Sequence, residues 1–134
     1  MSAGPDAALS AALVEALKAA PAVTALVAAR VHVDAPRRPT YPCVSLGRQE
    51  SRAFGPDADG LEHLLTVTCA SKFGGPEEAR ALVAAVRAAL HDARPALSGR
   101  RLVNLRVPYA DVFAGADRET TLGIVRVRAV TELL

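Results

Sequence analysis

The sequence feature that most constrains the fold is a pair of alternating segments in the last third of the chain, at about residues 101–109 and 122–131. Within each segment apolar side chains alternate with polar or charged ones: Val103, Leu105 and Val107 in the first, and Val125, Val127 and Ala129 in the second. This period of two is typical of strands that have one face in the core and the other in solvent or against a subunit. A polar turn containing Gly and Asp separates the segments, so we expect neighbouring strands of an antiparallel sheet.

The rest of the sequence predicts two main helices and further strands. Apolar residues at helical spacing predict one helix from an N-cap at Asp6 to about Ala20, and another from Pro76 to about Arg94, with His91 and Arg94 in its last turn before Pro95. Alternation predicts a short strand near residues 31–33, an extended segment at 43–53 and a strong strand at 61–71. Three prolines exclude a central strand at residues 35–42, which we interpret as an ordered loop or arm. We therefore expect a single α+β domain over residues 1–134, with a mostly antiparallel sheet and two main helices packed on one face.

Composition narrows the classes of function. The 134 residues carry a net charge of +2, and the 16 positive and 14 negative residues alternate along the chain, whereas a nucleic-acid binder more often has a clustered basic stripe. Aromatic residues make up only 4%, so small aliphatic residues fill the core and a partner subunit would add apolar burial. The first residues lack a basic secretory signal, and the longest apolar stretch, near residues 21–29, is too short for a bilayer. We expect a soluble, cytosolic protein.

No group of residues predicts catalysis, cofactor binding or metal binding. His32, His63 and His91 are scattered, and a structural or surface role suits each of them. Cys43 and Cys69 lack the spacing of a zinc site and fit small hydrophobic residues in a reducing compartment. Acidic pairs in two loops, at residues 57–59 and 117–119, are better explained by turn formation than by calcium binding. We therefore expect a protein that is not an enzyme and uses no cofactor.

The candidate functional residues are instead those of an interaction surface. Arg126 and Arg128 share one strand face, and Arg106 is expected beside them, either as a row that lines a subunit contact or channel, or as an ordinary solvated face. Such a row of like charges costs energy unless carboxylates or a polyanion balance it, and Glu62, Asp111 and Glu132 are the carboxylates expected nearby. Two loops, at residues 54–60 and 113–121, each begin with a Phe and contain acidic residues. The candidate subunit or tube interface is Arg106, Arg126, Arg128, Phe54, Asp57, Asp59, Phe113, Asp117, Arg118, Glu119, and Arg37 and Arg38 in the Pro-rich arm.

Four stretches carry a resemblance to a known family over almost the whole chain. They are ALVEALKAAPAVTALVAARVHVDAP, YPCVSLG, LEHLLTVTCASKFGGPEEARALVAAVRAALHDA and LVNLRVPYADVFAGADRETTLGIVRVRAVTE. The chain resembles the small tail-terminator (tail-completion) proteins of long-tailed bacteriophages and of the gene transfer agents of alphaproteobacteria, most of all the gene-transfer-agent version. The similarity lies in patterned hydrophobic residues and turn positions, without an invariant chemical motif.

The resemblance implies a structural protein of a phage-like particle, assembled in the bacterial cytoplasm. It implies a ring, typically of six copies, that sits on the end of the tail tube, stops tube polymerisation and docks the head connector. The implied partners are further copies of the chain, the major tail tube protein and the head–tail connector protein, without a membrane. DNA would pass through the ring without sequence-specific binding.

A second hypothesis belongs to another class of function. An apolar sheet face covered by helices also suits a small ligand-binding or regulatory α+β module. An enzyme is the third and weakest reading of the sequence.

Overall fold

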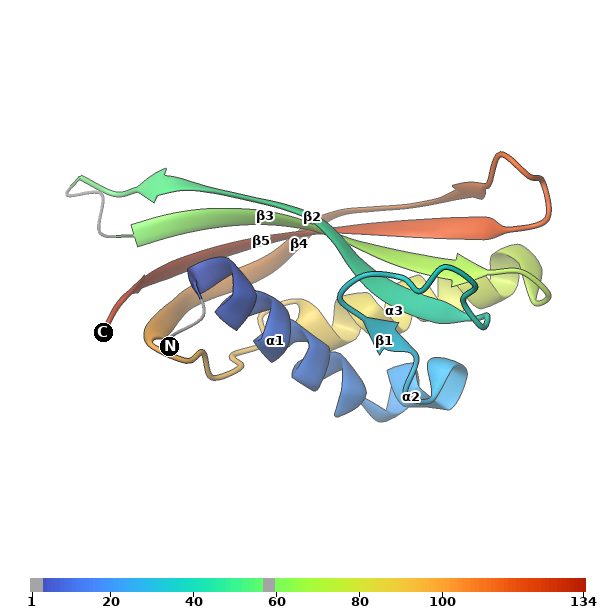
Figure 1. Cartoon of the computed structure of the whole chain (residues 1–134), viewed down its shortest axis with the longest axis horizontal. Helices are drawn as coiled ribbons and strands as arrows, with labels where there is room; N and C mark the ends of the chain where they lie inside the picture. The colour runs from blue at the N-terminus through green and yellow to red at the C-terminus, as the bar shows by residue number, and fades with distance from the viewer. Residues whose placement is uncertain (1–3, 57–59) are drawn as a thin grey trace.

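The computed structural model describes residues 4–56 and 60–134, which form a long sheet with helices on one side (Figure 1). The elements in chain order are α1 (Pro5–Lys18), α2 (Pro21–Val27), β1 (Val31–His32), β2 (Cys43–Phe54), β3 (Gly60–Ser71), α3 (Gly75–Leu90), β4 (Arg100–Ala114) and β5 (Thr121–Leu133). The strand order is β1-β2-β3-β5-β4, with β1 parallel to β2 and every other pair antiparallel. The predicted α+β fold with a mostly antiparallel sheet is confirmed.

The core lies between the sheet and the helices, and its residues follow the predicted periodicities. Helices α1 and α3 each bury one stripe, and β3 and β5 bury alternate residues: Leu9, Leu13 and Leu17 in α1, Leu82, Val86 and Leu90 in α3, Leu65 and Val67 in β3, Val125 and Val127 in β5. Helix α3 packs closely on β5 at Gly123, where a Cβ atom would lie 2.3 Å from Cγ2 of Val83. A glycine is therefore required at this position for the helix to pack.

The first helix differs from the prediction at both ends. Its N-cap is Gly4, and Asp6 lies inside the first turn instead of capping it. Pro5 begins the helix because its fixed φ suits the first turn, where a missing N–H costs nothing. The helix ends at Lys18, before the predicted Ala20, because the residue that precedes Pro21 is driven out of the helical region. Pro21 then starts α2. The helix α3 also ends earlier than predicted, at Leu90 and not at Arg94: His91 is extended at the C-cap, and its Nδ1 accepts a hydrogen bond from the Val107 amide.

Two irregularities in β4 explain one incorrect assignment. The ladder between β4 and β5 shifts register between Leu102 and Asn104, and again between Arg106 and Tyr109. Val103 was predicted on the buried face but lies within the first shift and is 39% exposed. An extra residue in one strand of a pair interrupts the alternation of its side chains. Leu105 and Val107, between the two shifts, are buried as predicted.

The strands run further than predicted, so the connections between them are shorter. Phe54 ends β2 and Gly60 begins β3, whereas Phe113 is still within β4 and β5 begins at Thr121. The Pro-rich segment joins the parallel strands β1 and β2, and Arg30 donates a hydrogen bond from Nε to the Pro42 carbonyl at 2.8 Å. The rest of this segment, with Arg37 and Arg38, is exposed.

Both cysteines are buried and unpaired, as small core residues. Cys69 on β3 is fully buried, and burial raises the pKa of its thiol to about 12. Burial also raises the pKa of Cys43, which begins β2. Both thiols therefore stay protonated at neutral pH.

Candidate functional site

The sheet face that points away from the helices is the candidate functional surface, and we call it the open face. It is formed by the residues that alternate with the core positions: Glu50, Arg52 and Phe54 in β2, Glu62, Leu64 and Thr66 in β3, Arg126 and Arg128 in β5, and Arg106, Tyr109, Asp111 and Phe113 in β4. The ladder places Arg128 opposite Leu64 on one side and Arg106 on the other. The prediction that Arg106 lies beside the Arg126–Arg128 row is therefore confirmed.

A carboxylate with two arginines forms the most ordered part of the open face. Glu62 accepts a hydrogen bond from Nε of Arg128 at 2.6 Å and another from Nε of Arg52 at 2.5 Å. These two hydrogen bonds hold the pKa of Glu62 below its ordinary value, and the bond from Arg128 has the larger effect. Burial of the carboxylate opposes this shift. Arg128 also lies over the ring of Phe54, with its guanidinium carbon 5.7 Å from the ring centre. The prediction that the Glu62 carboxylate lies near the arginine row is therefore confirmed.

The other arginines of the row have separate partners. Arg126 lies over the ring of Tyr109, its register partner on β4, at 5.1 Å. Arg106 pairs with Asp92, which follows α3, at 3.1 Å. Of the two other carboxylates expected near the row, Glu132 pairs with Arg101, and Asp111 accepts a hydrogen bond from the Tyr109 hydroxyl at 3.3 Å. Charges of both signs thus cover this surface.

A shallow groove of about 430 Å³ crosses the open face between β2 and β4. Its lining includes Arg48, Glu50, Leu64, Tyr109 and Arg126. Among the described residues, no group of three His, Cys, Asp or Glu side chains could hold a metal ion. The groove therefore offers mixed charge and apolar area, which suits contact with a macromolecular surface.

The predicted loop residues lie at opposite ends of the sheet (Figure 1). Phe54 is 43% exposed at one end, where Asp57 and Asp59 fall outside the described residues, and Phe113 is 44% exposed towards the other end. The hairpin tip beyond Phe113 contains the exposed side chains Asp117, Arg118 and Glu119. The candidate residues that the structure describes therefore lie on one central face and at two opposite ends of the sheet, with Arg37 and Arg38 exposed on the Pro-rich segment.

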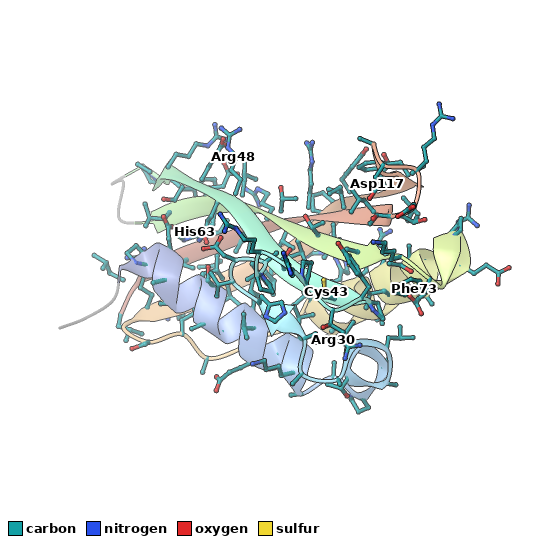
Figure 2. The ribbon with its side chains drawn as sticks, turned by 45° about the vertical axis from the view of Figure 1, so that its right-hand side comes forward. Arg30, Cys43, Arg48, His63, Phe73 and Asp117 are labelled. Atoms are coloured by element: carbon teal, nitrogen blue, oxygen red, sulfur yellow. The ribbon has the colours of Figure 1, made fainter. Side chains whose placement is uncertain are left out.

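Asp117 organises the hairpin tip (Figure 2). Its carboxylate accepts hydrogen bonds from the amides of Glu119 and Thr120 at 3.0 and 2.9 Å, and from the Thr120 hydroxyl at 2.8 Å. The bonds from Thr120 are the main reason that the pKa of Asp117 is lowered. Asp117 thus forms the turn, as expected, and this leaves Arg118 and Glu119 as the charged groups that the tip presents.

A buried polar chain ties α1 to the sheet on the helix side. His63 is fully buried, with Nδ1 3.0 Å from the Asp6 carboxylate and Nε2 2.9 Å from the Thr131 hydroxyl (Figure 2). Burial lowers the pKa of His63, although Asp6 opposes this shift, so the ring is neutral, donates from Nδ1 and accepts at Nε2. Arg100 donates to the same Thr131 hydroxyl at 3.0 Å. These satisfied contacts give His63 a structural role.

Sequence reasoning missed two residues of the open face, Arg52 and Tyr109, and one exposed aromatic residue outside it, Phe73. Arg52 shares Glu62 with Arg128, Tyr109 stacks under Arg126, and Phe73 is 87% exposed in the turn between β3 and α3. The alternation of Arg52 with Phe54 was the available signal for Arg52. The position of Tyr109 depends on the second register shift in β4, which no sequence pattern predicts.

Within the described part of the chain, no single helix is long and apolar enough to cross a membrane. Only α1 and α2 taken together pass such a test, and they are bent by 83° relative to each other.

Comparisons with known proteins agree with one another. The family model for the tail completion protein gp17 matches residues 11–132. A chain in a solved structure of the virion of a native gene transfer agent (GTA) particle is similar at a TM-score of 0.87 and 29% identity, over 98% of this chain and 99% of that chain. A comparison with curated protein sequences gives no match. The chain therefore belongs to the tail completion protein family, and its role is that of a structural protein of tail assembly.

Proposed function

We propose that the chain is a tail terminator that assembles into a ring of six copies on the end of a tail tube. The ring stops polymerisation of the tube protein and provides the surface on which the head–tail connector docks. The observation that carries this proposal is the match along nearly the whole chain, both to the tail completion family and to a chain of a gene transfer agent virion. On this basis the protein is assembled in the bacterial cytoplasm and becomes part of a phage-like particle.

The separation of the two tips supports a protein with two docking sides. The end that carries Phe54 and the hairpin tip that carries Arg118 and Glu119 lie at opposite ends of the sheet (Figure 1). If the strands run from one side of the ring to the other, these ends form opposite rims. One rim then contacts the tube and the other contacts the connector.

The mixed charges of the open face support a channel that DNA passes without being held. Glu62 accepts hydrogen bonds from both Arg52 and Arg128, and Asp92 forms an ion pair with Arg106. Arginines that are already paired with carboxylates neutralise fewer phosphates, so tight and strongly salt-dependent DNA binding is not expected. No base-specific reading is needed for this role.

The experiment that tests this function measures ring mass and tube length together. Purified protein, alone and mixed with tail tube protein, is analysed by light scattering and by electron microscopy. We expect a species with the mass of six copies, and tubes that stop growing once this species is added. A protein that stays monomeric in both samples and leaves tube length unchanged contradicts the proposal.

A charge reversal at one tip sharpens the test. Arg118→Glu changes an exposed residue of the hairpin tip outside the core, so the fold and ring mass should not change. We expect it to weaken either tube capping or connector docking, but not both. Arg80→Glu, on the exposed side of α3, is the matched control and should affect neither activity.

A further inference from the structure

The two edges of the sheet are each half covered by the chain itself. On the β2 edge, β1 pairs with Val44 and Ser45 only. On the β4 edge, the amide of Asp92 donates to the Leu105 carbonyl at 2.9 Å, and the amide of Val107 donates to Nδ1 of His91 at 3.0 Å. The remaining halves, residues 47–54 of β2 and 109–114 of β4, are mostly exposed. In the described parts of the chain they make no backbone hydrogen bond outside their own ladders.

These two free segments can pair with each other across two copies of the chain. β2 and β4 run in opposite directions, because both β2–β3 and β3–β5 are antiparallel and β4 is antiparallel to β5. A rotation that continues the sheet from one copy to the next therefore places β4 of one copy antiparallel to β2 of the next. Each copy uses two different edges, so the contact is heterologous and repeats until it closes a ring.

The two free segments are offset from each other along the strand direction, and the size of this offset suits a closed barrel. Arg52 is level with Glu62 and Val130, whereas Asp111 is level with Ile124, six residues away on β5. Six residues span about 20 Å along a strand, and four strands span about 19 Å across the sheet. Joining the free segments thus tilts the strands by about 45° from the ring axis. Closed barrels have tilts of about 35–45°.

We propose that residues 50–54 of β2 in one copy pair antiparallel with residues 109–113 of β4 in the next, with Arg52 opposite Asp111 and Phe54 opposite Tyr109. All four side chains lie on the open face, and directly opposite residues point to the same side. This register sets a cation against a carboxylate and one aromatic ring against another. Asp111 has the Tyr109 hydroxyl as its neighbour within the chain, and Arg52 is largely exposed, so both can reach a second partner.

The paired segments lie outside the halves of the two edges that the chain itself covers. The cover that His91 and Asp92 provide on β4 ends at Val107, just before the paired segment begins. The cover that β1 provides on β2 ends at Ser45. This inference rests on the proposed ring and deepens it, because it names the strands that join neighbouring copies. With six copies, about 24 strands form one continuous sheet, well above the 16–18 that already leave an open channel in porins.

Disulfide trapping tests the register in the assembled protein. Arg52→Cys combined with Asp111→Cys places two thiols on directly opposite residues, whose Cβ atoms lie about 4.5–5.5 Å apart in such pairs. Arg48→Cys combined with Asp111→Cys is the matched control, since Arg48 is four residues, or about 13 Å, out of register. Both proteins, with and without tail tube protein, are treated with oxidised glutathione and run on a non-reducing gel. Phe54→Cys with Tyr109→Cys is a second in-register pair, should the first variant fail to fold.

We expect a ladder of linked species up to the mass of the ring for the in-register pairs, and monomer for the control. Light scattering before oxidation separates the two proposals. Rings that form but do not cross-link in either in-register pair overturn the edge pairing and leave the terminator ring standing. Cross-linking of the control pair instead overturns the stated register. Monomer in every sample, with or without tube protein, overturns both the ring and the edge pairing.

Discussion

Leu64 and Leu65 are neighbours on β3, yet they belong to two surfaces with different tasks. Leu65 is 2% exposed and packs into the core under the helices, whereas Leu64 is 42% exposed on the open face. The helix side is aliphatic with one satisfied polar chain through His63, and the open side carries arginines, carboxylates and aromatic rings. The same strands therefore provide stability through one set of alternate residues and an interaction surface through the other.

The largest expected effect comes from truncating the two leucines separately. Leu65→Ala should lower the free energy of unfolding by about 2–5 kcal/mol, because it removes buried methyl groups and leaves a cavity. Leu64→Ala should lower it by less than about 1 kcal/mol, because this side chain already contacts solvent. Urea denaturation at one fixed protein concentration measures both. Equal losses would show that the open face is as important for stability as the core.

A smaller effect is expected from the carboxylate of the open face. Glu62→Gln should lower the free energy of unfolding by about 1–3 kcal/mol, because Arg52 and Arg128 lose a charged acceptor that is nearly buried. Glu50→Gln, on the same face, is the control: its pair with Arg48 is exposed, and the expected change is within about 0.5 kcal/mol. Thermal unfolding compares the two variants with the unaltered protein. If both variants behave alike, the Glu62 cluster adds nothing beyond an ordinary surface pair.

The smallest expected effect is a pH dependence of stability, which arises from His63 on the helix side of the sheet. Burial lowers the pKa of His63 in the folded protein, so the unfolded chain takes up a proton at this residue first as the pH falls. The stability that the neutral ring provides is therefore fully present above about pH 6.5 and is lost as the pH falls through the folded pKa. Melting temperatures between pH 7.5 and 5.5 should show this decline.

His63→Asn supplies the comparison for the pH experiment. It should lower the melting temperature at every pH, because two buried hydrogen bonds change, but it should flatten the decline between pH 7.5 and 5.5. If the melting temperature of this variant declines as steeply as that of the unaltered protein, other groups cause the pH dependence. Glu62 does not explain it, because its pKa is held below the ordinary value of a carboxyl group.

The two faces also differ in how far the sequence predicts them. Helical and alternating periods located α3 and the buried residues of β3 and β5, because burial repeats at a fixed interval along the chain. The Glu62 cluster joins three strands, and the pairing of Arg52 with Glu62 depends on a register shift in β2 between Leu46 and Gln49. Asp6 and His63 lie 57 residues apart. Local patterns contain no information on such long-range pairing, so they do not predict the contact of Asp6 with His63 or the register shift at Val103.

The protonated, enclosed thiols of Cys43 and Cys69 have a practical consequence for labelling the protein. Maleimides and iodoacetamides react with accessible thiolates. The folded chain, with its natural sequence, should therefore not react with these reagents. A fluorophore or spin label can then be attached at one chosen surface position while both natural cysteines remain in place. Distances between labels on neighbouring subunits become measurable in intact particles.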